Sequence, residues 1–101
     1  MKIAIDFDGV VCKRKGIPTI RGKWNDEPVE GSLESILLFK KLGYKVWIFT
    51  SNPELNKVKK WLLKNRFPLL EVTNIKKPAH AYIDDRAIRF TNWQDVRKYF
   101  S

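Results

Sequence analysis

The chain has 101 residues, of which 44% are hydrophobic and 31% are charged. This length favours one domain, and the hydrophobic share is large enough for a packed core, so the composition argues against disorder. No apolar run approaches the ~20 residues that a membrane-spanning helix needs, and the run from Met1 meets the charge of Asp6 too soon for a signal peptide. Because Cys12 is the only cysteine, no intrachain disulfide can form, and we expect a cytoplasmic protein without a membrane partner.

The chain is strongly basic, with a formal net charge of +9 at pH 7 and a sequence pI of about 9.9. A balance of this kind suits anionic substrates or contact with nucleic acid, because phosphate groups attract lysine and arginine side chains. Simple solubility accounts for the same charge, so the composition leaves both interpretations open.

The first half of the chain predicts a strand, a long loop, a helix and a second strand. Residues 2–7 are a short apolar run rich in strand-forming side chains, and residues 9–28 contain glycines and prolines without a helical period. Ser32 is predicted to cap a helix that ends at Gly43, and the apolar run 46–49 predicts a second buried strand.

The second half predicts two more strands and two more helices. Asn52 is expected to cap a helix, residues 69–72 and 81–83 read as short strands, and Asn92 is expected to cap a last helix over 93–99. Strands that alternate with helices imply an α/β fold with a mostly parallel sheet flanked by helices.

Polar residues follow three of the predicted strands, where open parallel sheets bind their ligands. These residues are Asp6, Asp8, Thr50, Ser51, Asp84 and Asp85. If the first and fourth strands are neighbours, four carboxylates converge, and their mutual repulsion calls for a cation. Ligation by oxygen alone suits Mg²⁺. The only histidine, His80, has no partner of its kind for a zinc site, and we interpret it as structural or exposed.

Four segments of the chain resemble the motifs of a known family. Residues 6–11 (DFDGVV), 47–51 (WIFTS), 76–78 (KKP) and 82–86 (YIDDR) are similar, in this order, to the four motifs of the haloacid dehalogenase (HAD) superfamily of phosphohydrolases. The resemblance implies a Rossmann-like HAD fold, Mg²⁺ as cofactor, and hydrolysis of phosphomonoesters by way of a phospho-aspartate.

The resemblance also implies a role for each matching residue of the first two motifs. Asp6 would be the nucleophile and a metal ligand, and Asp8 would be the general acid and base, with its backbone carbonyl on Mg²⁺. Thr50 would hydrogen-bond the phosphoryl group, and the backbone N–H groups of Phe7 and Ser51 would complete its cradle.

For the last two motifs the resemblance gives two competing residues for each role. Lys77 would steady the charge on the nucleophile and the phosphate, with Lys76 as the alternative. Asp85 would bind Mg²⁺ directly, with Asp84 supporting it or reaching the ion through water.

Most members of this family insert a cap domain between motifs, but the spaces here are too short for one. Residues 12–28 and a stretch of about twenty-five residues after the second motif are both below the ~50 residues of a small domain. We therefore expect a single HAD-like hydrolase domain over 1–101 with no cap domain. Substrate selection would fall to Arg14 and Lys15 of the basic loop and to Arg86, which favours a nucleotide or a nucleic-acid end, with a small sugar phosphate as the alternative.

Two other function classes use similar residues. Receiver domains also combine acidic residues, a Thr or Ser and a Lys on a parallel sheet, but their phospho-accepting aspartate ends a middle strand, whereas the middle strand predicted here ends in Thr50 and Ser51. The second alternative is a basic nucleic-acid-binding protein that keeps the fold without turnover. The intact pair of Asp6 and Asp8 argues against it.

Overall fold

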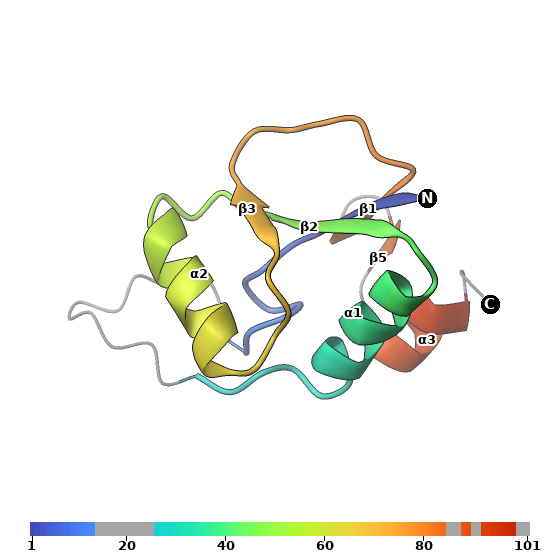
Figure 1. Cartoon of the computed structure of the whole chain (residues 1–101), viewed down its shortest axis with the longest axis horizontal. Helices are drawn as coiled ribbons and strands as arrows, with labels where there is room; N and C mark the ends of the chain where they lie inside the picture. Colours follow the sequence, from blue (N-terminus) through green and yellow to red (C-terminus); the bar gives the residue numbers. More distant parts are fainter. Residues whose placement is uncertain (14–25, 85–87, 90–91, 99–101) are drawn as a thin grey trace.

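The computed structural model describes residues 1–13, 26–84, 88–89 and 92–98. Strands and helices alternate as far as residue 73, and the next strand follows without a helix between, as the sequence predicts (Figure 1). The elements are, in chain order, β1 (Lys2–Ile5), α1 (Ser32–Lys41), β2 (Lys45–Phe49), α2 (Leu55–Lys64), β3 (Glu71–Thr73), β4 (Ala81–Asp84), β5 (Ile88–Arg89) and α3 (Trp93–Lys98). The two-residue strand β5 was not predicted from the sequence. Its two residues are too few to produce a hydrophobic pattern.

The strands form one parallel sheet in the order β3-β2-β1-β4-β5. The condition that the first and fourth strands are neighbours is met, since Ile5 of β1 is aligned with Ile83 of β4. The middle strand is β1, so the expectation that the middle strand ends in Thr50 and Ser51 is wrong. The reason is that the chain adds β2 and β3 on one side of β1 and then crosses to the other side for β4. In open parallel sheets the crevice at such a switch point is where ligands bind.

One face of the sheet carries the hydrophobic core. Ile3 and Ile5 of β1 and Ile48 of β2 are fully buried on this face, and each contributes about 1.5–3 kcal/mol by leaving water. All three helices add side chains to the same buried cluster: Ile36, Phe39, Val58, Trp61, Leu62, Trp93 and Val96. The helices therefore lie on one side of the sheet, as Figure 1 shows.

The opposite face is covered by the connection 74–80 instead of a helix. This connection runs from β3 to β4 on the side away from the helices (Figure 1). It is shorter than most crossovers between parallel strands, which usually need a dozen residues or more. Trp47 lies on this face, 2% exposed, with Lys77 Nζ 4.7 Å from its ring centre. The rings of Phe49 and Tyr82 meet edge to face at 5.8 Å. The expectation that helices flank the sheet holds for one face only.

Two predicted helix caps differ from the structure. The cap of α1 is Gly31, with φ 85°, and Ser32 is the first helical residue; its hydroxyl donates to the carbonyl oxygen of Val11 at 3.5 Å. Asn52 does not cap α2. Its Oδ1 accepts the N–H of Glu54 at 2.9 Å, which forms a turn before the helix. Side chains that bond nearby backbone groups compete with helical geometry, and here they delay the helix start.

The third cap is confirmed, because Asn92 Oδ1 accepts the N–H of Asp95 at 2.9 Å in the first turn of α3. Position 99, the predicted end of this helix, lies outside the described residues. Within the described ranges, no helix has the length and apolar composition that crossing a membrane requires.

Candidate functional site

The described polar residues at the carboxyl ends of β1, β2 and β4 lie at one edge of the sheet. The N–H of Asp6 donates to the carbonyl oxygen of Ile83 at 3.1 Å, which continues the β1–β4 pairing by one residue and places Asp6 beside Asp84. On the other side of β1, the N–H of Thr50 donates to the carbonyl oxygen of Thr73 at 3.0 Å. The backbone thus gathers these residues at the carboxyl ends of the strands, as the sequence predicts.

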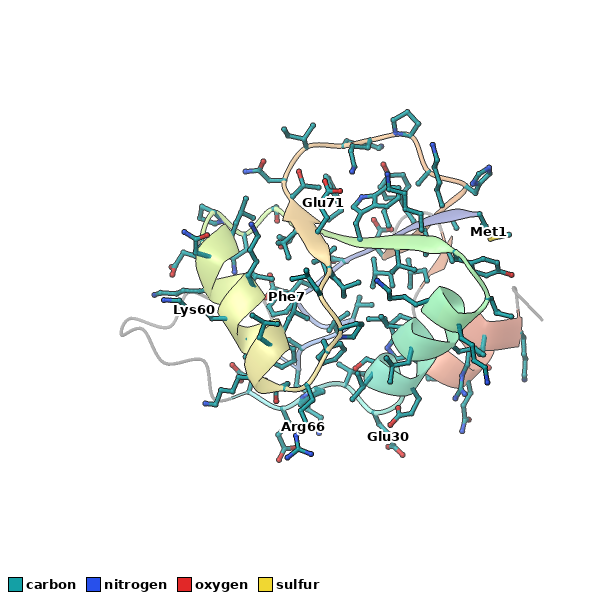
Figure 2. The ribbon with its side chains drawn as sticks, in the orientation of Figure 1. Met1, Phe7, Glu30, Lys60, Arg66 and Glu71 are labelled. Carbon is teal, nitrogen blue, oxygen red and sulfur yellow. The ribbon has the colours of Figure 1, made fainter. Side chains whose placement is uncertain are left out.

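A tight turn after β1 fixes both aspartates of the first motif. The carbonyl oxygen of Phe7 accepts the three successive N–H groups of residues 10–12, at 3.3, 3.0 and 3.1 Å. The Phe7 ring is fully buried and meets the Trp61 ring edge to face at 5.2 Å, between the sheet and α2 (Figure 2). Because Phe7 is anchored in the core, Asp6 and Asp8 on either side of it are held, half-buried, at the sheet edge.

The turn depends on Gly9, which has φ 79° and donates its N–H to the carbonyl oxygen of Cys12 at 2.8 Å. A Cβ atom at this position would meet nothing within 4 Å. Glycine is therefore favoured by the backbone conformation and not by lack of space.

The two carboxylates have different surroundings. Asp6 Oδ1 accepts the N–H of Phe7 at 2.8 Å, which orients the carboxylate on its own strand end. Asp8 Oδ1 is shielded from solvent. A backbone N–H stabilises the ionised form of the acceptor, so the turn favours a charged, oriented Asp6.

Thr50 is 1% exposed, and its Oγ1 accepts the N–H of Asn52 at 3.1 Å. A hydroxyl that accepts a hydrogen bond still has its own proton to donate. Ser51, next to it, is exposed. Thr73 repeats this arrangement on the neighbouring strand, where its Oγ1 accepts the N–H of Ile75 at 3.0 Å. Sequence reasoning missed Thr73, although a threonine at the end of an apolar run was a usable signal.

The predicted active-site lysine is not beside the carboxylates. Lys77 Nζ lies 2.8 and 2.7 Å from the two carboxylate oxygens of Glu71, which is the first residue of β3 and lies on the side of the 74–80 connection (Figure 2). The alternative, Lys76, has its Nζ 5.4 Å from the centre of the Tyr82 ring. Glu71 was not anticipated as a partner because its closeness to Lys77 depends on the path of the connection.

The donor atoms at the edge suit a hard cation, but the structure gathers only part of the predicted ligand set. Among residues 1–13, 26–84, 88–89 and 92–98, no three His, Cys, Asp or Glu side chains form a group able to hold a metal ion. Asp6, Asp8 and Asp84 share the edge, and Asp85 lies outside the described residues. The available donors are oxygen atoms, which fit Mg²⁺. His80 is exposed at the opposite edge, where its Nδ1 accepts the N–H of Lys2 at 2.8 Å, so its structural interpretation is confirmed.

The predicted substrate-binding residues Arg14, Lys15 and Arg86 also lie outside the described residues. At the start of the basic loop, Lys13 Nζ lies 3.4 Å from a carboxylate oxygen of Glu27, and both side chains are largely exposed. Exposed pairs of this kind stabilise little, so this contact does not restrain Lys13 from binding another anion.

The edge therefore combines two carboxylates on a rigid turn, a third on the adjacent strand and a buried threonine hydroxyl. In general, a carboxylate can serve as a nucleophile or, when protonated, as an acid, and a hydroxyl can donate a hydrogen bond. No family model, curated protein or solved structure matches the chain.

Proposed function

We propose that this protein is a Mg²⁺-dependent phosphomonoester hydrolase that forms a phospho-aspartate on Asp6. The observation that carries the proposal is the position of Asp6 at the end of the middle strand, beside Asp84 through the hydrogen bond to Ile83. The site thus sits at the switch point of the sheet, where ligands bind in this class of fold. The resemblance of residues 6–11 and 82–86 to HAD motifs supports the same chemistry.

In the first half-reaction, a carboxylate oxygen of Asp6 attacks phosphorus while the bond from phosphorus to the ester oxygen breaks. Asp8 donates its proton to the departing oxygen, which leaves as an alcohol. In the second half-reaction, a water oxygen attacks phosphorus and Asp8 takes up the water proton. The acyl–phosphate bond breaks, and Asp6 regains its carboxylate. The hydroxyl of Thr50 donates to a phosphoryl oxygen in both steps.

The residues proposed to hold Mg²⁺ are Asp6, Asp85 with the support of Asp84, and the backbone carbonyl of Asp8. When bound, the ion offsets the repulsion between an anionic nucleophile and an anionic phosphate. The turn at Phe7 and the pairing of β1 with β4 keep Asp6, Asp8 and Asp84 on one edge.

A receiver-like function is the second candidate, and the position of Asp6 at the end of the middle strand favours it more than the sequence did. Both functions share phosphoryl transfer to Asp6. They differ in the fate of the acyl phosphate, because a hydrolase needs an acid and base next to it. Asp8, two residues away and half-buried at the same edge, favours rapid hydrolysis and therefore the enzyme.

A phosphatase screen with and without Mg²⁺ tests the proposal. The panel is nucleotides, oligonucleotides phosphorylated at either end, sugar phosphates and phosphopeptides. Wild-type protein should show Mg²⁺-dependent turnover, and Asp6→Asn should reduce it to background. The matched control is Asp95→Asn, which removes one exposed carboxylate from α3 and should leave turnover unchanged. Phosphorylation of Asp6 without release of inorganic phosphate would support a receiver. Binding of a polyanion with neither phosphorylation nor phosphate release would support a non-catalytic protein.

The net charge of +9 favours an anionic polymer or a nucleotide as substrate. A triple variant, Lys13, Arg14 and Lys15 each to Ser, tests this extension. KM for a phosphorylated oligonucleotide should rise and lose salt dependence, while KM for a small aryl phosphate should stay nearly unchanged. Equal effects on both substrates, or none on either, would show that the loop does not select the substrate.

A further inference from the structure

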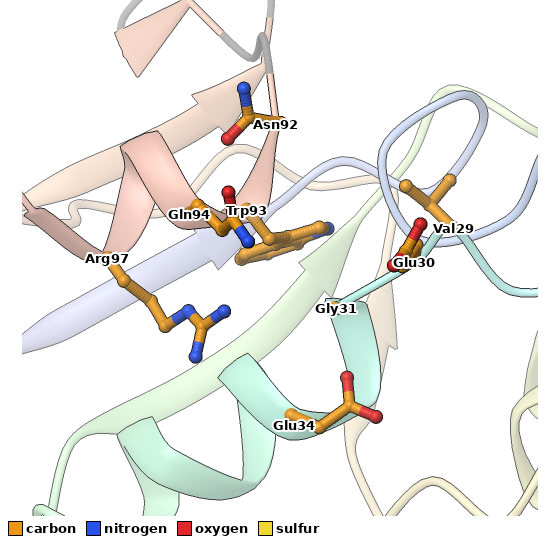
Figure 3. A pocket seen from close by; sticks show the side chains of 8 residues that line it. All are labelled: Val29, Glu30, Gly31, Glu34, Asn92, Trp93, Gln94 and Arg97. Atoms are coloured by element: carbon orange, nitrogen blue, oxygen red, sulfur yellow. The ribbon is translucent and has the colours of Figure 1, made fainter.

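A hollow lies between the start of α1 and α3 (Figure 3). Its volume is about 570 Å³, within the ~300–1,000 Å³ range of small-molecule pockets. Its polar lining comes from Glu30, Glu34, Asn92, Gln94 and Arg97. None of these residues takes part in the proposed phosphatase site.

The guanidinium of Arg97 has an unmet bonding requirement in this hollow. Its Nε is buried and makes no hydrogen bond with any residue that the structure describes. A buried polar group without a partner costs on the order of 1–3 kcal/mol, and more when it is charged. Nε has almost no accessible surface, so a ligand acceptor removes this cost once the Arg97 side chain turns toward the hollow.

Two carboxylates line the same space, Glu34 from α1 and Glu30 from the turn before it. Figure 3 shows the Arg97 side chain on the α3 side and the side chains of Glu30 and Glu34 on the α1 side, with the Trp93 ring between the two sides. Neither glutamate side chain forms an ion pair or hydrogen bond with the described part of the chain. Thus the cation and the two anions of the hollow do not neutralise each other directly.

The walls of the hollow are held in place before any ligand arrives. Trp93 is 1% exposed, and its Nε1 donates to the carbonyl oxygen of Val10 at 2.9 Å. Its ring packs against Phe39 of α1 at 6.3 Å. At Gly31 a Cβ atom would lie 3.1 Å from Trp93 Cβ, so the start of α1 approaches α3 closely. A preformed pocket binds with a smaller ordering cost.

The mixed charges define the class of ligand. Glu30 and Glu34 would repel a simple anion, and Arg97 would repel a simple cation. A molecule that carries one negative and one positive charge can pair with Arg97 and with the two glutamates at once. We propose that this hollow binds a small zwitterion, with its carboxylate on Arg97 and its protonated amine on Glu30 and Glu34.

A series of amino acids of increasing length tests this proposal. The probes are glycine, β-alanine, γ-aminobutyrate, δ-aminovalerate and ε-aminocaproate, which separate the same two charges by successive methylene groups. Binding is followed by NMR of the ¹⁵N-labelled full chain, through the Arg97 Nε–H resonance, which is assigned by its loss in Arg97→Lys. One length should bind best and shift this resonance. The amine and the carboxylic acid of matching length, each alone, should bind at least about tenfold more weakly.

Matched variants separate binding from folding. Arg97→Gln and Glu34→Gln should each raise Kd for the best probe by about tenfold or more. The controls Arg66→Gln and Glu27→Gln make the same changes at exposed positions outside the hollow and should leave Kd unchanged. If Arg97→Gln does not fold, Arg97→Lys keeps the charge and loses the Nε–H, and it should still weaken binding. The absence of a shift with every probe, or equal binding of the lone amine and the lone acid, would overturn the proposal.

Discussion

Lys77 and Glu71 form a two-contact ion pair, with Nζ 2.8 and 2.7 Å from the two carboxylate oxygens, at the start of β3. The carboxyl end of β3 is two residues further on, roughly 7 Å away at the usual strand rise. The two side chains are 31% and 49% exposed, and pairs this exposed contribute only about 0.2–1 kcal/mol. The ion pair alone is therefore a weak restraint on Lys77, whose Nζ also lies 4.7 Å from the centre of the Trp47 ring.

We predict that Glu71→Gln leaves kcat/KM unchanged or raises it by up to about fivefold, because about 1 kcal/mol of competing attraction is removed. Lys77→Gln should lower kcat strongly, and Lys76→Gln should have little effect. Steady-state kinetics of the three variants checks this assignment. If Lys76→Gln lowers kcat and Lys77→Gln does not, the role of Lys77 is limited to its ion pair between the 74–80 connection and β3.

Thr50 and Thr73 form a natural matched pair, since Thr50 directly follows β2 and Thr73 is the last residue of β3. Each Oγ1 accepts the N–H two residues later, at 3.1 and 3.0 Å. Replacing either by Val should lower the free energy of unfolding by about 1–2 kcal/mol through loss of this hydrogen bond. Only Thr50→Val should also reduce turnover, and Thr50→Ser should restore it. Denaturant unfolding and kinetics measure the two effects separately. Equal loss of turnover in both Val variants would show that strand-end order, and not phosphate binding, is responsible.

Gly9 and Gly43 have nearly the same backbone, with φ 79° and 82°, and a Cβ atom at either would meet nothing within 4 Å. Ala at either position should therefore cost about 1–2 kcal/mol of stability from backbone strain alone. Because Gly9 adjoins Asp8, only Gly9→Ala should also lower kcat. The expected pattern is similar melting temperatures with different activities. A Gly9→Ala protein with full activity would mean that the turn does not position Asp8.

Asp8→Asn should slow turnover by ~10²–10⁴-fold, the usual contribution of general acid and base catalysis. Mg²⁺ binding should persist, because the proposed contact is through the backbone carbonyl, which the substitution keeps. Calorimetric titration with Mg²⁺ checks this, with Asp85→Asn as the variant that should lose affinity. Loss of Mg²⁺ binding in Asp8→Asn as large as that in Asp85→Asn would contradict this division of roles.

The sequence predicted the parts of the fold that depend on local patterns. Buried runs such as 46–49 and the polar residues after them predicted the strands and the edge where Asp6 and Thr50 lie. The pairing of β1 with β4 was stated as a condition, and the alignment of Ile5 with Ile83 satisfies it.

What the sequence did not predict depends on contacts between distant segments. The partner of Lys77 follows from the path of the 74–80 connection, and the hollow beside Arg97 follows from the packing of α1 against α3. The helix caps at Gly31 and before α2 also depend on backbone geometry that propensity does not report.

The most direct test of the central claim is chemical trapping of the phosphorylated enzyme. The Asp8→Asn protein, mixed with a substrate found in the screen and Mg²⁺, is quenched rapidly and reduced with borohydride, which converts an acyl phosphate to an alcohol. Peptide mass spectrometry should find the reduced side chain at position 6, dependent on substrate and absent from Asp6→Asn. Turnover without any modification at position 6, or modification of a different aspartate, would contradict the assignment of Asp6 as the nucleophile.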